Sequence, residues 1–318
     1  MTTPAATGTP ASDDADRGPG TMEPGLVVRG LTKAYGRQRV LDALDLSIPA
    51  ATLAAVVGSN GAGKSTLLGC IAGTLRHDGT IRHDGSPLSA IPGQMAYLPQ
   101  RIRLPGSATV GEVLALFRAL AGPTRDRASA PEGFVPAGHR RIAELSGGQA
   151  QRVALAGMLF GAPRLLLLDE PYANLDDPAK DSLRDMLAAH RDGGATILVA
   201  SPAAFDLLAN ADLVVRVEAG QVVYHGPAPA FMAGLPVIIW VDPASNGSAT
   251  DIADIGLVTR TRIVAGRWAA LECREQDVSM ILDDLVARGI GIDRIRVAGP
   301  GGADLPAPPP DDTREGLR

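Results

Sequence analysis

Short, almost continuously apolar segments recur along the chain at residues 53–57, 165–168 and 195–200. Strands covered by helices on both faces have this pattern, because neither side of such a strand meets water. Between the last two segments, Leu183 and Leu187 share one side of a predicted helix at a spacing of four residues. The alternation of buried strands with helices predicts an α/β fold with a parallel core sheet.

Antiparallel pairing is predicted on either side of this core. Residues 26–29 and 41–48 indicate strands of a small antiparallel sheet, joined by a turn at 35–37. Residues 213–217 and 221–225 flank a short Gly-containing turn and predict a closing hairpin.

The pattern of apolar and polar residues changes after residue 227, and a small α+β extension is predicted there. Its helix, 278–287, has an apolar stripe made of Val278, Ile281, Leu282 and Leu285. Its strands are predicted at 236–241, 261–264, 268–273 and 292–297. We therefore expect a disordered leader over 1–25, a main domain over 26–227, a small α/β domain over 228–298 and a disordered tail over 299–318.

Composition and charge indicate which classes of protein fit this chain. The 318 residues are 45% hydrophobic, which supplies a sizeable core, and the net charge of −5 argues against a general nucleic-acid-binding surface. Cys70 and Cys273 lie far apart and match no metal spacing, so reduced, buried thiols of a cytosolic protein are expected. The longest apolar runs fall far short of the ~20 residues of a membrane-spanning helix, and the leader lacks the features of a signal peptide.

A glycine-rich segment follows the first apolar strand and leads into a predicted helix. Its pattern, G-x4-G-K-[ST], lets successive N–H groups point at phosphate oxygens, while the lysine reaches the β/γ-phosphates and the serine offers its hydroxyl to Mg²⁺. An ordinary turn is the alternative, which the GKST tetrad disfavours. The residues of this phosphate loop are Gly58, Ser59, Asn60, Gly61, Ala62, Gly63, Lys64, Ser65 and Thr66.

Two adjacent carboxylates end the apolar strand at 165–168. Asp169 can hold Mg²⁺ through water, and Glu170 can polarise the water that attacks the γ-phosphate. One carboxylate could simply end a strand, but a pair downstream of a phosphate loop favours phosphate chemistry.

A second anion-binding helix start is predicted just before this strand. Ser146 and two glycines precede a helix predicted at 153–160, and an ordinary Ser-capped helix is the alternative. This signature segment consists of Leu145, Ser146, Gly147, Gly148 and Gln149.

With these motifs in this order, residues 26–227 resemble the ATP-binding subunits of ABC transporters. The resemblance implies a P-loop NTPase fold of ABC type, with a parallel core sheet, an antiparallel β subdomain and a helical subdomain. It also implies that ATP and Mg²⁺ bind, and that the signature of one subunit is presented to ATP on the phosphate loop of the other in a head-to-tail dimer.

The resemblance extends to single residues. Tyr35 is similar to the aromatic residue that stacks on adenine, or it packs locally in its hairpin. Gln100 is similar to the glutamine that senses Mg²⁺ and the attacking water, or it is a solvated loop residue. Asp176 resembles part of the loop that crosses the dimer interface, and it can also cap the next helix.

Two departures from the family pattern stand out. Ser201 occupies the position after the last core strand where the family usually has a histidine, so slow hydrolysis is expected. His190 and His225 are interpreted as surface residues. Residues 122–138 are rich in Pro and Gly where relatives carry further helix, so a trimmed helical subdomain is expected.

The preferred function is an ATPase that powers a separate membrane permease, with export favoured by motif spacing and by the extension. Such a subunit would sit on the cytoplasmic face of the membrane as a homodimer or heterodimer, and no nucleic-acid partner is expected. A soluble ABC-type switch in DNA repair or translation is one alternative. A degenerate subunit that hydrolyses little ATP and acts as a regulatory or heterodimer partner is another, which Ser201 favours and Lys64, Asp169 and Glu170 oppose.

Overall fold

The computed structural model describes residues 24–88, 94–121, 130–201, 205–242, 255, 257–264, 268–274, 277–288 and 290–297. The predicted tail lies outside these residues, as does the predicted leader apart from its last two positions, which belong to the first strand. Within the described ranges, no helix combines the length and apolar character needed to cross a bilayer.

An antiparallel sheet of four strands, ordered β2-β1-β4-β5, opens the fold. β1 (Pro24–Tyr35) and β2 (Gln38–Pro49) are longer than the sequence predicts. Their pairing includes β-bulges and continues to the turn, where Tyr35 pairs with Gln38. The sequence analysis missed β4 (Asp78–His83) and β5 (Ser86–Pro87), which are short and carry mostly exposed or polar residues.

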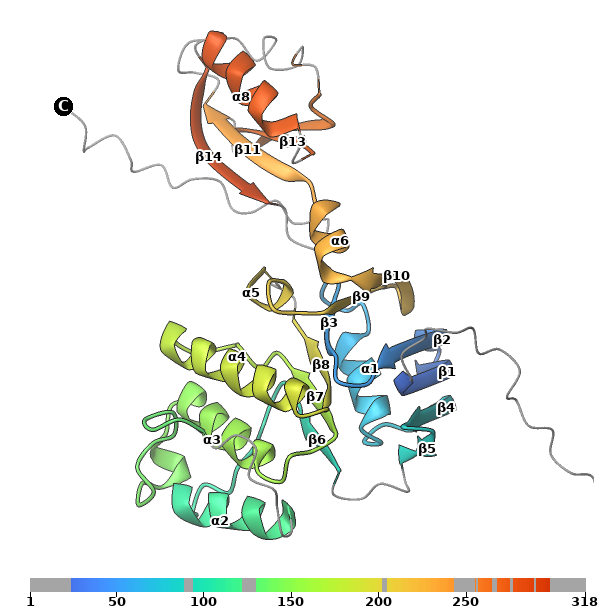
Figure 1. The fold of residues 1–318 in the computed structure, drawn as a ribbon, viewed down its shortest axis with the longest axis vertical. Helices are drawn as coiled ribbons and strands as arrows, with labels where there is room; N and C mark the ends of the chain where they lie inside the picture. Colours follow the sequence, from blue (N-terminus) through green and yellow to red (C-terminus); the bar gives the residue numbers. More distant parts are fainter. Residues whose placement is uncertain are drawn as a thin grey trace, which may run out of the picture.

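The core sheet has six strands in the order β10-β9-β3-β8-β7-β6, as Figure 1 shows at the centre of the molecule. β3 (Leu53–Val57), β7 (Leu165–Asp169) and β8 (Thr196–Ala200) are buried at every position, which confirms the prediction of a covered parallel core. β9 (Leu213–Glu218) and β10 (Gln221–Pro227) form the predicted antiparallel hairpin, and β6 (Met95–Leu98) is the opposite edge strand.

Helices cover the two faces of this sheet. Val56 and Leu167 pack with α1 (Lys64–Ile71), whereas their neighbours along the strands pack with α3 (Gly147–Leu159) and α4 (Asp177–Asp192). Successive strand residues point to opposite faces, so α1 and α3 lie on opposite sides of the core sheet. A short helix, α5 (Phe205–Leu208), follows β8.

The helical subdomain is short, as expected. α2 (Val110–Ala121) packs against α3, and a single 3₁₀ turn, η2 (Ile142–Glu144), precedes the signature. Within the described residues 130–146 there is no α-helix.

A second domain follows the short helix α6 (Ala228–Ala233), and Figure 1 shows it beyond the core sheet. Its sheet is antiparallel in the order β12-β13-β11-β14. The stripe of α8 (Val278–Ala287) packs on it as predicted, with Ile281 and Leu285 fully buried. The strands are β11 (Val237–Asp242), β12 (Arg260–Val264), β13 (Trp268–Cys273) and β14 (Gly291–Val297).

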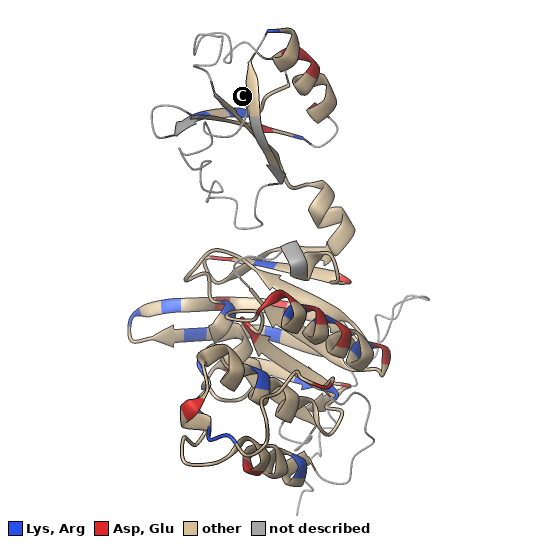
Figure 2. Ribbon diagram, turned by 90° about the vertical axis from the view of Figure 1, so that its left-hand side faces the viewer, with Lys and Arg blue, Asp and Glu red and all other residues tan. Residues whose placement is uncertain are grey.

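Lys and Arg residues are interspersed with Asp and Glu residues along the ribbon (Figure 2). On α4, acidic and basic side chains alternate and form ion pairs one turn apart, such as Asp181 with Arg184. Cys70 and Cys273 are both free and buried, as the sequence predicts.

Candidate active site

The phosphate loop connects the end of β3 to the start of α1. Gly58 permits the loop to pass close to β9, since a Cβ atom there would lie 2.2 Å from the carbonyl oxygen of Val217. Gly63 has a φ of 107°, a conformation that favours glycine, and it precedes the first turn of α1. The outer residues of the loop, Ser59, Asn60 and Gly61, are exposed, so their backbone is accessible to a ligand.

Lys64 lies buried inside this loop. Its ammonium group donates hydrogen bonds to the carbonyl oxygens of Gly58 at 2.8 Å and Ser59 at 2.9 Å. Burial lowers the pKa of Lys64, while the nearby carboxylates of Glu170 and Asp169 raise it. The lysine is therefore close to both the phosphate loop and the two acidic residues.

Asp169 ends β7 next to the phosphate loop and is only 2% exposed. Burial raises the pKa of this carboxyl group, and hydrogen bonds donated by the Ser65 hydroxyl and the Gln100 backbone N–H lower it. Its Oδ1 atom has no hydrogen-bond partner among the described residues. A buried carboxylate oxygen without a partner, next to a serine hydroxyl, suits Mg²⁺, which prefers oxygen ligands.

No group of three or more His, Cys, Asp or Glu side chains that could hold a metal occurs within the described ranges. A cation at Asp169 would therefore need further oxygens from a bound phosphate. Mg²⁺ in nucleotide sites is held in this way, by a few protein oxygens together with phosphates.

Glu170 is held in a turn beyond the strand end. Its φ of 52° is unusual for a residue with a side chain, and its N–H donates to the carbonyl of Ala200 at 2.8 Å. The side-chain amide of Gln100 donates to Glu170 Oε1 at 2.9 Å. The two residues, 70 positions apart, therefore meet at the end of the core sheet where β6 and β7 finish.

Gln151 of α3, which was not among the predicted site residues, fixes the same turn. Its amide donates to the carbonyl oxygens of Glu170 at 3.2 Å and Pro171 at 2.9 Å. The available signal was its place two residues after Gln149 in the signature. Gln151 thereby connects the helix of the signature with the backbone that carries Glu170.

Ser201 is buried at the end of β8, directly beyond the residue that pairs with Asp169. Its N–H donates to the carbonyl of Val56 at 3.2 Å, which holds Ser201 at the same end of the core sheet as Asp169 and Glu170. The surface interpretation of His190 is wrong: its ring nitrogens face the carbonyl oxygens of Met186 and Leu159 in the core. His225 is exposed, as predicted.

The signature forms the first turn of α3, which begins at residue 147, six positions earlier than predicted. The Gln149 N–H donates to Ser146 Oγ, and the Ser146 N–H donates to Gln149 Oε1, both at 3.2 Å, so the Ser-capped helix is present. Ser146 and Gly147 are exposed. α1 and α3 cover opposite faces of the core sheet, so the phosphate loop and the signature begin helices on opposite sides of that sheet.

Two further candidates lie at the surface. Tyr35, at the end of β1, is 50% exposed, and the Lys33 ammonium lies 4.9 Å from the centre of its ring. Asp176 caps α4 by accepting a hydrogen bond from the Ala179 N–H at 3.2 Å, and it lies 4.0 Å from Arg152. Asp176 is thus an N-cap, and it remains exposed on the side of the signature helix.

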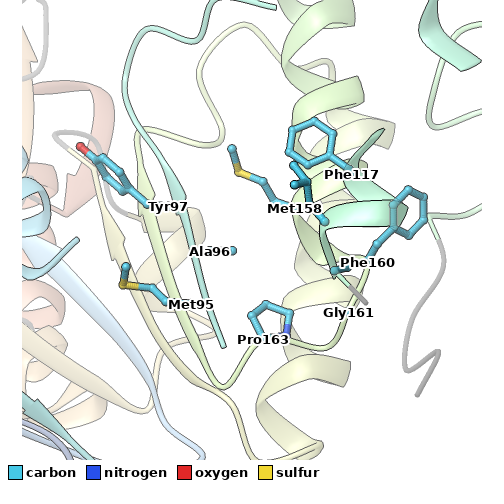
Figure 3. A pocket seen from close by; sticks show the side chains of 11 residues that line it. Met95, Ala96, Tyr97, Phe117, Met158, Phe160, Gly161 and Pro163 are labelled. Carbon is cyan, nitrogen blue, oxygen red and sulfur yellow. The ribbon is translucent and has the colours of Figure 1, made fainter. Parts of the chain in front are cut away.

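A pocket of about 270 Å³, lined mostly by apolar residue types, lies between the edge strand β6 and helices α2 and α3 (Figure 3). Leu120 on α2 is 71% exposed beside it, and the Arg118 guanidinium covers the Phe160 ring at 4.5 Å. Gly157 lets α2 approach closely, since a Cβ there would lie 2.3 Å from the Phe117 ring. The pocket is lined by Met95, Ala96, Tyr97, Phe117, Leu120, Ala121, Gly157, Met158, Phe160, Gly161 and Pro163.

Comparison with known proteins bears on this arrangement. A family model described as ABC transporter matches residues 41–173. The aliphatic sulfonates import ATP-binding protein SsuB 2 of Agrobacterium fabrum is 38% identical over 209 residues, which are 62% of this chain and 78% of that protein. SsuB of Escherichia coli is 37% identical over 202 residues, with the same coverage.

Solved structures agree on the fold. The ATP-binding subunit of an ABC transporter superposes with a TM-score of 0.58 at 26% identity, covering 65% of this chain and 91% of that one. An ATP-binding cassette in its ADP conformation gives a TM-score of 0.55 at 22% identity, covering 65% and 92%. The phosphate loop and carboxylate pair thus lie in a fold that these proteins share.

Proposed function

Because this chain belongs to the ATP-binding subunits of ABC transporters, which are ATPases, we propose that it drives a separate membrane permease by ATP-dependent closure of a dimer. The observation that carries the proposal is the junction of Gln100, Glu170 and Asp169 beside Lys64. Groups from the ends of two neighbouring strands, β6 and β7, and from the start of α1 meet where the γ-phosphate of a nucleotide on the phosphate loop would lie.

Each group has a role that its position supports. The loop N–H groups and Lys64 bind phosphate oxygens, and Tyr35 offers an exposed ring to the adenine. Ser65, Asp169 and the amide oxygen of Gln100 would hold Mg²⁺, which when bound neutralises charge on the phosphates. Glu170, oriented by the Gln100 amide, accepts a hydrogen bond from the attacking water.

A second subunit supplies the signature. Ser146 and Gly147 are exposed at the start of α3, which covers the face of the core sheet opposite α1 and its phosphate loop. A head-to-tail dimer brings this helix start to the nucleotide of the partner, with Gly148 and Gln149 shaping the turn and Asp176 on the neighbouring loop. The partner is a second copy or a related ATPase subunit.

The apolar pocket is the proposed contact with the permease. Its edge strand β6 leads directly to Gln100, so a permease segment seated there is connected to the residue that orients Glu170. An apolar helical segment suits the lining and the exposed Leu120. With this contact, the proposed location of the chain is the cytoplasmic face of the membrane.

The names of the relatives bear on the predicted direction of transport. Export, expected from the motif spacing, gains no support from them, because both are named import proteins. The proposal is therefore ATP-driven transport, with import as the direction of these relatives.

Hydrolysis by mixed subunits tests the dimer. Lys64→Ala disables the phosphate loop, and Gly147→Glu places a negative charge where the partner's phosphates would lie. The Gly147 site is open, since a Cβ there meets nothing within 4 Å. Each variant alone should be inactive, while a mixture should regain activity, because hybrid dimers keep one intact site. A mixture that stays inactive, with both variants folded, contradicts the proposed arrangement.

Co-purification tests the permease contact. Leu120→Glu should weaken capture of a membrane permease while leaving basal ATP hydrolysis unchanged. Met280→Glu on α8, a residue that is 61% exposed, is the matched control and should keep the partner. Equal capture by both variants would show that the pocket is not the docking site.

Ser201 favours a second candidate, a subunit that binds ATP and hydrolyses it slowly. A serine at the end of β8 cannot bring the positive charge of an imidazole to the γ-phosphate. Ser201→His should then raise turnover without changing ATP affinity. Turnover that is fast in the unaltered chain and insensitive to Ser201→Ala would dismiss this candidate.

A further inference from the structure

The hairpin of β9 and β10 comes close to a strand of the other sheet in the main domain. Both strands of the hairpin belong to the core sheet, whereas β2 belongs to the antiparallel sheet, and β10 nevertheless lies beside β2. Ala219 and Gly220 join β9 to β10, with φ values of 47° and 78°. A two-residue turn with positive φ at both positions matches the twist of its hairpin, so it forms a compact tip. We call residues 218–221 the β9–β10 turn.

One side of the β9–β10 turn holds the phosphate loop. The Gly220 N–H donates a hydrogen bond to the carbonyl oxygen of Ala62 at 3.2 Å. Ala62 belongs to the phosphate loop and is only 4% exposed. Because Gly58 also lies close to the Val217 carbonyl, the loop meets this hairpin at two positions.

The other side of the β9–β10 turn holds β2. The Asp42 N–H donates to the carbonyl oxygen of Gly220 at 3.3 Å, and the side-chain amide of Gln221 donates to the carbonyl oxygen of Asp42 at 2.6 Å. The contact leaves no room for a side chain at Gly220, because a Cβ atom there would lie 2.2 Å from the carbonyl oxygen of Val40. Gly220 therefore connects the phosphate loop, through its N–H, with β2, through its carbonyl group.

β2 leads from this contact to Tyr35. About 13 Å of strand separates Asp42 from Gln38, which pairs with Tyr35 at the end of the β1–β2 hairpin. The ring assigned to adenine and the loop assigned to the phosphates therefore belong to different sheets. The β9–β10 turn bonds both to the loop and to the strand that leads to the ring.

We propose that Gly220 and Gln221 are positioning residues for the nucleotide, which set the distance between the Tyr35 ring and the phosphate loop. The inference rests on the proposed function, in which Tyr35 contacts the adenine. A ligand held at two points binds most tightly when the spacing of the two contacts is fixed before it arrives. A diphosphate without a base uses the phosphate loop alone, so its affinity does not depend on this spacing.

Titration calorimetry with Mg²⁺-ADP and with Mg²⁺-pyrophosphate tests the proposal, because neither ligand is a substrate of the proposed reaction. Gln221→Ala should weaken ADP binding about 5-fold, the order expected for one lost hydrogen bond, and should leave pyrophosphate binding unchanged. Gln221→Lys keeps an N–H donor and should restore the affinity for ADP. His225→Ala, at an exposed position on the same strand, is the matched control and should change neither affinity.

The comparison of the two ligands separates positioning from a general loss of structure. An equal loss for ADP and pyrophosphate in Gln221→Ala would show that the turn only supports the fold of the phosphate loop, and would overturn the proposal. So would unchanged binding of both ligands.

Tyr35→Ala separates this inference from the proposed function. It should weaken ADP binding and leave pyrophosphate binding unchanged. If Tyr35→Ala binds ADP normally, the adenine contact is wrong and the positioning role is wrong with it. If Tyr35→Ala weakens ADP binding and Gln221→Ala does not, the adenine contact stands and only the positioning role is refuted.

Discussion

Two helix starts in this chain offer backbone N–H groups to anions, and they are built in different ways. α1 begins after Gly63, which has no side chain to cap the helix, and the loop before it closes around the buried Lys64. α3 begins at Ser146, which makes a complete capping box with Gln149 and stays exposed. The first start depends on a cation and on neighbouring carboxylates, whereas the second satisfies the Gln149 N–H with its own cap and faces outward. A motif that is stable by itself can be presented to another subunit, while one that encloses charge is suited to hold the ligand.

The largest effect is expected from Lys64→Ala, which removes the cation of the first helix start. ATP hydrolysis should fall at least ~10²-fold, as when a preorganised charge is deleted from a phosphate site. Steady-state phosphate release measures this, with Lys180→Ala on α4 as the control that keeps full activity. Retained hydrolysis in the Lys64 variant would remove the phosphate loop from the mechanism.

Asp169→Asn should abolish Mg²⁺-dependent hydrolysis and yet stabilise the nucleotide-free protein. Burial raises the pKa of Asp169 above that of an unfolded aspartate, so the folded protein binds this proton more tightly. Its contribution to stability therefore falls as the pH rises through and above the ordinary carboxyl range. Asparagine cannot ionise, so the variant should lose this pH dependence.

Thermal unfolding over a pH series without nucleotide measures the effect of Asp169→Asn. Asp185→Asn, at an exposed position on α4, should change neither the melting temperature nor its pH dependence. A variant that melts lower than the unaltered chain at neutral pH would show that Asp169 stabilises the fold.

Gly148→Ala should disturb the first turn of α3, because the added Cβ meets the neighbouring backbone. A Cβ at this position would lie 2.2 Å from the backbone carbonyl oxygen of Asn174, and overpacking against backbone costs about 1–3 kcal/mol. Urea unfolding should show this loss, and hydrolysis should fall because the signature turn moves. Gly147→Ala, which meets open space, is the matched control for stability. Equal stability of the two variants would mean that the loop at Asn174 moves aside without lowering the free energy of unfolding.

The smallest effect is expected from Ser146→Ala. Loss of the N-cap should lower the free energy of unfolding by about 1 kcal/mol, the usual cost of removing a serine cap. The affinity of the isolated subunit for ATP should stay unchanged, because Ser146 begins α3, on the side of the core sheet opposite α1 and its phosphate loop. Equilibrium unfolding and nucleotide titration of the same variant separate the two effects, and weaker ATP binding by the monomer would contradict that separation.

Several elements were predictable from local pattern alone. β3, β7 and β8 are continuous apolar runs, and α8 has a complete amphipathic stripe, so burial periodicity identified them. β4 could not be found in this way, because a mostly exposed strand shows no apolar pattern. His190 was misplaced for the complementary reason: its two carbonyl contacts come from the fold, and a histidine gives no local sign of them.

The sequence by itself determined the chemistry of this protein. Phosphate binding needs glycines, a lysine and a hydroxyl at fixed short spacings, and these can be recognised without coordinates. The tertiary structure alone decided which distant groups act together. Gln100 meets Glu170, and Ser201 reaches the same end of the sheet, because β6, β7 and β8, which precede or carry these residues, are neighbours in the core sheet. Gln151 of α3 holds the turn at Glu170 and Pro171. Strand order is set by long-range packing of apolar faces, and no local spacing in the chain encodes it.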